Sequence, residues 1–551
     1  MKNKVFKFIS ILSLASTVLI VSCKKKIDDA YLNPNAAVRE PVESILPSVI
    51  GGMIYFYSSN GTTFGVQLDG TLIGRYVQYW GTTSSLELYG EMGPATGVTD
   101  NTGSMWGSVY YAGGANINKI IEWGTEEQKW DYVGVALAIR AWGWLELTDE
   151  YGDAILKQAF NPSLQQFLYD PQPDFYDSCR AVCFRSLSFL NRTDGNVSQA
   201  NLAIGDAYMN NGDVNKWKKF VYGVLARSYN NLSNKDIYKS KNYGDSAIKY
   251  ADLAMTTNDD NVTAKFQGGS LAPANNYFGP YRGFVGTFRQ GAYIADLMSG
   301  RNDSAFKGVP DPRATYMLRE NLNGEYKGFT PWLGTSSLAT NDYPQNFWGH
   351  ATPSSTGAPT VDNSRYVFQN TSPWPLMTAS EMQFIKAEAA LRKGDRATAL
   401  TAYKNAISLD FDMLTTTYPQ NIPVAKVITP ASKTAYLANP AIVPIPSELT
   451  LSHIMLQKYI ALYAWGTQET WTDMRKFHYV DVDPITPTGR QVYASFVPPS
   501  GQYLYTTNNG KLVYRFRPRY NSEYLYNIPE LTRIGAMNND YNTYEMWFSQ
   551  K

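Results

Sequence analysis

The chain has 551 residues, of which 44% are hydrophobic and 18% are charged, and its formal net charge is +1. Near-neutrality argues against a general nucleic-acid binder, which should present a basic face. Three cysteines exclude a disulfide framework. Aromatic residues make up 14% of the chain. Many of these rings stand in polar, loop-like sequence, where they suit a binding surface.

The first 22 residues have the pattern of a lipoprotein signal peptide. Three lysines precede an uncharged run over residues 8–21, which is shorter than the roughly 20 apolar residues of a membrane span. The run ends in LIVSC, similar to the bacterial lipoprotein box, so we expect cleavage before Cys23 and lipidation of its thiol. Residues 23–40 then form a lipidated tether. Removal of the leader, which holds three lysines and no acidic residue, lowers the net charge of the chain to −2. A plain secretory signal with an incidental cysteine is the alternative.

From residue 41 the hydrophobic spacing becomes helical, at 131–149, 174–190, 213–232, 243–255, 377–410 and 450–477. Two of these segments repeat a spacing of small residues. Gly394 precedes Ala399 and Ala406, and Gly244 precedes Ala247 and Ala251. This spacing is typical of tetratricopeptide-like helix pairs. We predict a mostly α-helical fold with about four helical hairpins, within one domain over residues 41–551.

Residues 258–375 break the helical pattern and are rich in Gly, Pro, Asn, Ser, Thr and rings. We expect long, ordered loops that form a ligand face, because a ring offers an apolar surface to a sugar or a peptide side chain. The candidate ligand-binding residues are Tyr277, Phe278, Tyr281, Trp332, Tyr343, Phe347, Trp348 and Trp374. The alternative for each ring is that it fastens its loop to the helices.

Motifs for catalysis and metal binding are missing from the sequence. There is no His-Glu-x-x-His, Gly-x-Ser-x-Gly or Walker-type loop. The three histidines have no ligand spacing, and the acids at 259–260 lack the spacing of a calcium loop. Cys179 and Cys183 are expected to be small buried hydrophobes. We therefore expect no enzyme activity, metal or cofactor. A surface glycoside hydrolase or peptidase, or a ligand-free scaffold, remains the alternative.

Five charged or aromatic motif residues invite a catalytic interpretation. They are Asp311, Arg313, Trp471, Asp473 and Arg475. A structural role is favoured, because Trp471 lies on one face of a helix with Met474. Asp473 and Arg475 are then placed to join neighbouring helices through hydrogen-bonded ion pairs.

Several stretches, taken in this order, resemble the SusD/RagB family of Bacteroidetes outer-membrane lipoproteins. They are the box at Cys23, RAWGWLELTDEYGDA, WKKFVYGVLARSYNNL, VPDPRA, EMQFIKAEAALRKGD, LQKYIALYAWGTQETWTDMRKF and YRFRPRYNSEYLYN. The resemblance implies a SusD-like fold of four tetratricopeptide-like units beneath a loop-rich ligand face. It implies a nutrient-binding protein, anchored by lipid and facing the cell exterior. Such a protein captures oligosaccharides or peptides and acts as the lid of a SusC-like TonB-dependent transporter. Three lysines at 24–26 precede the first acidic residues, so the sequence leaves open which face of the outer membrane receives the protein.

Overall fold

The computed structural model describes residues 39–57, 63–94, 103–486 and 488–551. The predicted signal peptide, Cys23 and the tether up to residue 38 lie outside the described residues. Among the residues described, no helix combines the length and the apolar character needed to cross a membrane. The longer helices are α2 (Val42–Ile54), α3 (Val66–Tyr76), α5 (Gly114–Glu126), α6 (Trp130–Tyr151), α7 (Gln172–Leu190), α8 (Gln199–Gly205), α9 (Val214–Asn230), α11 (Tyr243–Leu253), α12 (Ala292–Met298), α14 (Ala379–Arg392), α15 (Arg396–Thr417), α16 (Pro430–Ala438), α17 (Leu451–Ala461) and α18 (Thr467–Lys476).

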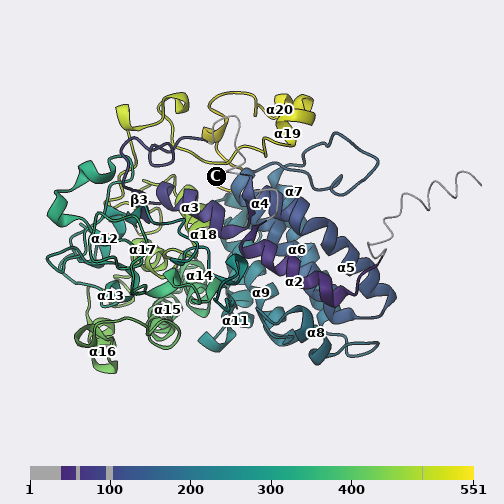
Figure 1. The fold of residues 1–551 in the computed structure, drawn as a ribbon, viewed down its shortest axis with the longest axis horizontal. Coiled ribbons are helices and arrows are strands. Elements are labelled where there is room, and N and C mark those ends of the chain that lie inside the picture. Colours follow the sequence, from purple (N-terminus) through teal and green to yellow (C-terminus); the bar gives the residue numbers. More distant parts are fainter. Residues whose placement is uncertain (1–38, 58–62, 95–102, 487) are drawn as a thin grey trace, which may run out of the picture.

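Five shorter helices, α4 (Ser104–Gly107), α10 (Asp236–Ser240), α13 (Ala314–Met317), α19 (Glu523–Tyr526) and α20 (Ile528–Arg533), lie in the connections. The strands form antiparallel pairs: β1 (Phe56–Tyr57) with β2 (Thr63–Phe64), β3 (Trp80–Thr82) with β5 (Phe288–Gln290), and β4 (Val262–Ala264) with β6 (Trp374–Met377). Figure 1 shows α5–α9 on one side of the molecule, the loops around α12 and α13 on the other, and the C-terminal segment across one edge. The fold is mostly helical, as predicted.

Helices α6 and α7 form the first antiparallel hairpin. The Cys179 thiol donates to the Ala141 carbonyl over 3.3 Å, and the Ser186 hydroxyl donates to the Gly134 carbonyl over 2.7 Å. Gly134 allows this approach, because a Cβ there would lie 2.6 Å from the Leu190 side chain. Packing on several sides buries every residue of α6 except Arg140, so the apolar stripe read from the sequence is in fact a helix buried all round.

Two further hairpins contain the repeated small residues. In the α9–α11 pair, Tyr222 lies 6.2 Å from Tyr250, ring centre to ring centre. In the α14–α15 pair, the Ser380 hydroxyl donates to the Ala406 carbonyl over 2.8 Å. The predicted alanines of both pairs are buried, namely Ala247, Ala251, Ala399 and Ala406. Gly394 is exposed, because it forms the turn between α14 and α15 with a φ of 83°. The predicted helical hairpins are therefore confirmed at these positions.

The segment at 450–477 folds as two helices rather than one. Thr450 caps α17 by accepting a hydrogen bond from the His453 amide, and the chain turns before Gly466, which precedes α18. Each residue of both helices is buried. This pair therefore fills the centre of the molecule between the repeat helices and the loops (Figure 1).

The loop-rich insertion is closed at its base by β4 and β6. Ala264 pairs with Trp374 and Val262 pairs with Met377, so the two ends of the predicted 258–375 region lie side by side. Between them the chain forms β5, α12, α13 and short 3-10 turns, separated by irregular segments.

Candidate ligand-binding face

The structure buries five of the eight candidate rings. These are Tyr277, Phe278, Phe347, Trp348 and Trp374, with exposed fractions of 5% or less. Phe347 stacks on Phe368 with ring centres 4.0 Å apart, and Phe278 meets Trp374 edge to face at 4.8 Å. The Trp348 indole N–H donates to the Phe278 carbonyl over 2.9 Å. These rings hold the insertion together, and their faces are covered by protein.

Three candidate rings remain accessible on the loops. Tyr281 is 50% exposed, and Trp332 and Tyr343 are half-buried. A further ring, Phe284, is 49% exposed and was missed among the candidates. It stands in the same YRGF run as Tyr281, so its neighbourhood was recognisable from sequence although its exposure was not.

Phe284 ends a ladder of three rings. Its ring stacks on Tyr277 with centres 4.4 Å apart, and Tyr277 stacks on Tyr55 at 4.3 Å. The Arg282 guanidinium lies over the Tyr55 ring at 4.6 Å and donates to the Ala272 carbonyl over 3.0 Å. Tyr277 and Arg282 therefore fix the orientation of Phe284, which carries the solvent-exposed end of the ladder.

One backbone segment joins the two groups of accessible rings. The Thr83 amide donates to the Thr287 carbonyl over 3.0 Å, and the Leu86 amide donates to the Trp332 carbonyl over 3.0 Å. Residues 83–86 thus run between the loop that carries Phe284 and the loop that carries Trp332. We call these four accessible rings, Tyr281, Phe284, Trp332 and Tyr343, together with the loops that carry them, the loop face.

Polar anchors hold the loops of this face in place. The Tyr281 hydroxyl donates to the Ser270 carbonyl over 2.6 Å, and its amide donates to the Asn370 side chain over 2.9 Å. The Tyr343 hydroxyl donates to the Thr335 carbonyl over 3.1 Å, and its ring meets Phe329 edge to face. A surface with rings fixed in this way loses little conformational entropy when it binds a flat ligand.

Asp311 and Arg313 lie in the core beneath the insertion. The Arg313 guanidinium contacts Asp311 at 2.6 Å and Asp410 of α15 at 2.7 Å. It also donates to Gln457 of α17. The two carboxylates raise the pKa of Arg313 well above its usual value, and burial raises the pKa of Asp410 to about 6. This cluster fastens the insertion to α15 and α17.

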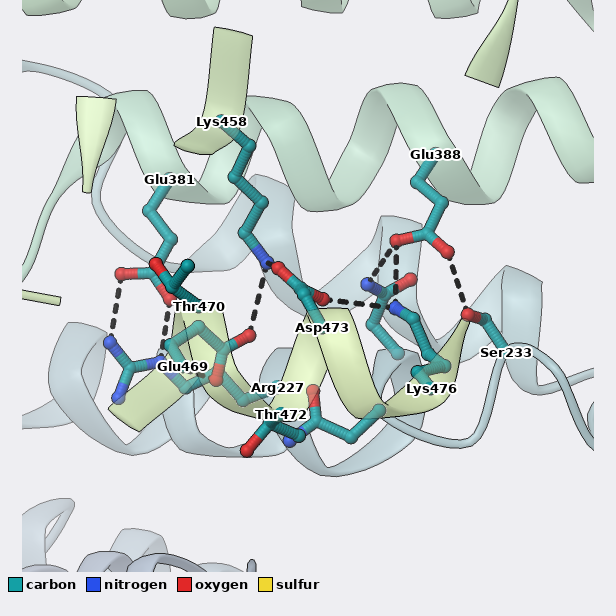
Figure 2. A network of polar contacts seen from close by, with 12 residues as sticks. Arg227, Ser233, Glu381, Glu388, Lys458, Glu469, Thr470, Thr472, Asp473 and Lys476 are labelled. Carbon is teal, nitrogen blue, oxygen red and sulfur yellow. Dashed lines mark hydrogen bonds and ion pairs between the residues drawn. The ribbon is translucent and has the colours of Figure 1, made fainter. Parts of the chain in front are cut away.

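Asp473 belongs to a buried ionic network that joins four helices (Figure 2). Asp473 lies 2.7 Å from Lys458 of α17 and 3.0 Å from Lys476. Lys476 also contacts Glu388 of α14 at 3.1 Å, and the pKa of Glu388 is lowered despite the burial of its carboxyl. At the other end Arg227 of α9 pairs with Glu381 over 2.6 Å. The network contributes most by orienting the helices, because the desolvation of buried ions offsets much of their attraction.

Arg475 differs from its predicted role in an ion pair. Its guanidinium donates to the Asp149 carbonyl over 2.6 Å and to the Tyr514 carbonyl over 2.8 Å, and it lies 3.7 Å from the centre of the Trp471 ring. Arg475 thus joins α18 to the end of α6 and to the C-terminal segment through main-chain carbonyls. On α18 itself it packs against Trp471, which is fully buried.

The two cysteines predicted to be buried hydrophobes are free and fully buried, which confirms that prediction. The acid at 260 has a local role, because Asp260 closes a capping box with Thr257 and pairs with Lys219 over 2.5 Å. Within the described ranges, no group of three His, Cys, Asp or Glu side chains is arranged to hold a metal ion.

Comparison with known proteins gives a consistent result. The SusD-like family described as "Starch-binding associating with outer membrane" matches residues 35–500. Among curated proteins no relative was found by sequence. A SusD/RagB family protein from Bacteroides thetaiotaomicron has 21% identity, covers 93% of this chain and 99% of its own, and has a TM-score of 0.62.

Two other solved structures have the same fold. A SusD homolog from Bacteroides fragilis has 19% identity, 92% and 100% coverage and a TM-score of 0.68. A chitin-binding SusD homolog from Flavobacterium johnsoniae has 18% identity, 93% and 99% coverage and a TM-score of 0.62. Together with the fold and the ordered motifs, the family match across most of the chain leads to one conclusion: the protein belongs to the SusD-like family.

Proposed function

We propose that this chain is a lipid-anchored, nutrient-binding protein of the outer membrane that captures oligosaccharides on its loop face. The observation that carries the proposal is the exposed Phe284 ring, held by the Tyr277–Tyr55 stack at one end of the loop face. A fixed ring that is about half exposed suits the C–H face of a sugar. The family description, which names starch binding, and the chitin-binding relative support a glycan in preference to the peptide alternative.

Binding measurements on one matched pair of variants test the loop face. Phe284→Ala removes the exposed ring, and Phe184→Ala removes a ring that is 46% exposed on α7, away from the loops. We expect Phe284→Ala to weaken binding of the best ligand of a glycan array by about 5- to 30-fold and Phe184→Ala to leave it unchanged, since one stacked ring contributes about 1–2 kcal/mol. Equal affinities for both variants would place the ligand elsewhere.

The proposed activity is capture without turnover. The purified protein is incubated with starch and chitin oligosaccharides and with a peptide panel, and products are followed by mass spectrometry. Binding with no new products is expected. Hydrolysis of any member would favour the glycoside hydrolase or peptidase alternative. Binding confined to peptides would show that the ligand is a peptide and not a glycan.

The anchor and the partner follow from the lipoprotein box and the family resemblance. We propose that acylated Cys23 attaches the protein to the outer membrane and that the protein closes a SusC-like TonB-dependent transporter. After separation of membrane and soluble fractions, Cys23→Ala protein should appear in the soluble fraction. Affinity purification of the wild type should recover the transporter. Recovery of the transporter by a protein that binds no glycan or peptide would favour a ligand-free scaffold.

A further inference from the structure

A cleft lies on the helical side of the molecule. It has a volume of about 700 Å³ and is lined by α5, α6, α7 and the segment 156–160. Figure 1 shows these helices on the opposite side of the molecule from β3 and α12. The size falls within the range of small-ligand sites, which is about 300–1,000 Å³.

Arg140 gives this cleft its chemical character. It is the one residue of α6 that is not buried. Its guanidinium donates to the Gly114 carbonyl over 3.1 Å, and no carboxylate of the described residues lies within ion-pair distance. Burial and the nearby Arg185 lower the pKa of Arg140 to about 10, so it remains charged at neutral pH. A guanidinium has five N–H donors, so most of its donors are available to a ligand.

The aromatic floor of the cleft is rigid. Trp144, one turn from Arg140 on α6, lies 6.3 Å from the Phe160 ring, and the guanidinium of Arg140 lies 5.2 Å from the same ring. Phe160 has a φ of 63°, a strained conformation for a bulky residue. Its ring packs on Gly114, where a Cβ would lie 2.3 Å from it. The backbone of α5 therefore holds Phe160 beside Arg140.

The acidic residues in the lining of the cleft already have partners. Asp174 pairs with Lys157 over 2.5 Å, and Asp177 pairs with Arg180 over 3.4 Å. Asn118 and Ser178 add an amide and a hydroxyl to the lining. Because Lys157 balances Asp174 and Arg180 balances Asp177, Arg140 is the cation of this lining that has no carboxylate partner among the described residues. One uncompensated positive charge matches a monoanion better than a dianion such as phosphate.

We propose that this cleft binds the carboxylate of a small ligand, with the ion held by Arg140 and the carbon skeleton packed against Trp144 and Phe160. A uronic acid of a glycan and the carboxyl terminus of a short peptide share this chemistry. The inference rests on the cleft alone and does not depend on ligand binding at the loop face.

Saturation-transfer NMR with free glucuronate, glucose and dialanine tests the proposal on the full-length protein. The wild type should bind glucuronate or dialanine through its carboxylate and should not bind glucose in the cleft. Arg140→Gln, which keeps donors but removes the charge, should weaken that binding by at least about tenfold. Lys119→Gln, which removes an exposed lysine from the neighbouring helix α5, should leave it unchanged.

Ser178→Phe provides a variant that blocks the cleft while Arg140 stays in place, and it too should abolish binding. Thermal unfolding of each variant reports whether it is folded. We expect a Kd of roughly 1 mM or lower for such small ligands. Absence of binding to both acids by the wild-type protein at about 10 mM ligand therefore overturns the proposal. So does unchanged binding in folded Arg140→Gln. Which of the two acids binds identifies the source of the carboxylate.

Discussion

Arg313 in the insertion and Asp410 on α15 form an ion pair of 2.7 Å in which both side chains are completely shielded from solvent. Asp311, two residues before Arg313, supplies the second carboxylate at 2.6 Å. The pair joins the loop-rich insertion to the last helical hairpin. It lies far too deep to contact a ligand, so its effect on function passes through stability.

Removal of Arg313 should destabilise the protein strongly. Arg313→Ala leaves two buried carboxylates without their cation, and such changes cost about 3–5 kcal/mol. Lys307→Ala breaks the exposed pair with Asp303, for which about 0–1 kcal/mol is expected. Urea unfolding followed by circular dichroism compares the two variants. A similar small loss in both would show that the Arg313 cluster adds little to stability.

The carboxyl groups of Asp69 and Glu150 should make stability depend on pH. Both are buried in the core, where burial raises the pKa of Asp69 to about 7, and burial together with the nearby Asp69 raises that of Glu150 well above its usual value, so we expect this pair to share a proton. The folded protein then binds more protons than the unfolded chain above about pH 4. The free energy of unfolding should therefore fall as pH rises from about 4 to about 7.

Glu150→Gln separates this pair from other titrating groups. The amide can donate to Asp69 without a titrating proton, so the variant should lose less stability than the wild type between pH 5 and pH 8. Glu448→Gln, at an exposed position, serves as the control and should follow the wild type. Chemical unfolding curves across the range measure the slope. Identical slopes for Glu150→Gln and the wild type would rule out the shared proton.

Cys179 and Cys183 should be inert in the folded protein. Both thiols are fully buried, and burial raises the pKa of Cys183, so little thiolate is available for reaction. In Cys23→Ser protein, a thiol-reactive dye should label neither residue under native conditions and both after denaturation. Absence of labelling after denaturation would indicate that the two residues form a disulfide, and rapid native labelling would indicate an open α6–α7 contact.

Tyr277 and Phe284 should respond differently to truncation although they stack on each other. Tyr277 is 5% exposed, so Tyr277→Ala opens a cavity that should cost about 3 kcal/mol or more and disturb Phe284 as well. Phe284→Ala should lower glycan affinity with a stability loss below about 1 kcal/mol. Thermal unfolding and titration calorimetry on both variants test this. A destabilised Phe284→Ala would mean that the ring is mainly a packing residue.

The helical part of the fold could be predicted from sequence because its contacts are periodic and local. Gly244, Ala247 and Ala251 mark the packed face of α11 by spacing alone, and all three are buried. The segment at 450–477 shows the limit of this approach. Its apolar pattern continues across the break before Gly466, so the helical spacing alone did not locate the end of α17 or the start of α18.

The candidate rings could not be sorted by sequence because their burial depends on distant partners. Trp348 bonds to Phe278, 70 positions away, and Phe347 stacks on Phe368 across another turn of the insertion. Phe284 has the same kind of polar neighbourhood and yet faces solvent. Arg475 has a similar explanation, since its acceptors are main-chain carbonyls of Asp149 and Tyr514, which no side-chain pattern reveals.

The β4–β6 pair has a consequence for how such a protein can diversify. Since Ala264 and Trp374 are hydrogen-bonded neighbours, the chain leaves the helices and returns to them at one point. The closure entropy of a loop grows slowly, by about 0.6 kcal/mol for each doubling of length. The irregular loops of the intervening segment can therefore change in length while Arg313 and β5 keep the segment attached to the rest of the fold, which would let one scaffold acquire new ligand preferences by loop exchange.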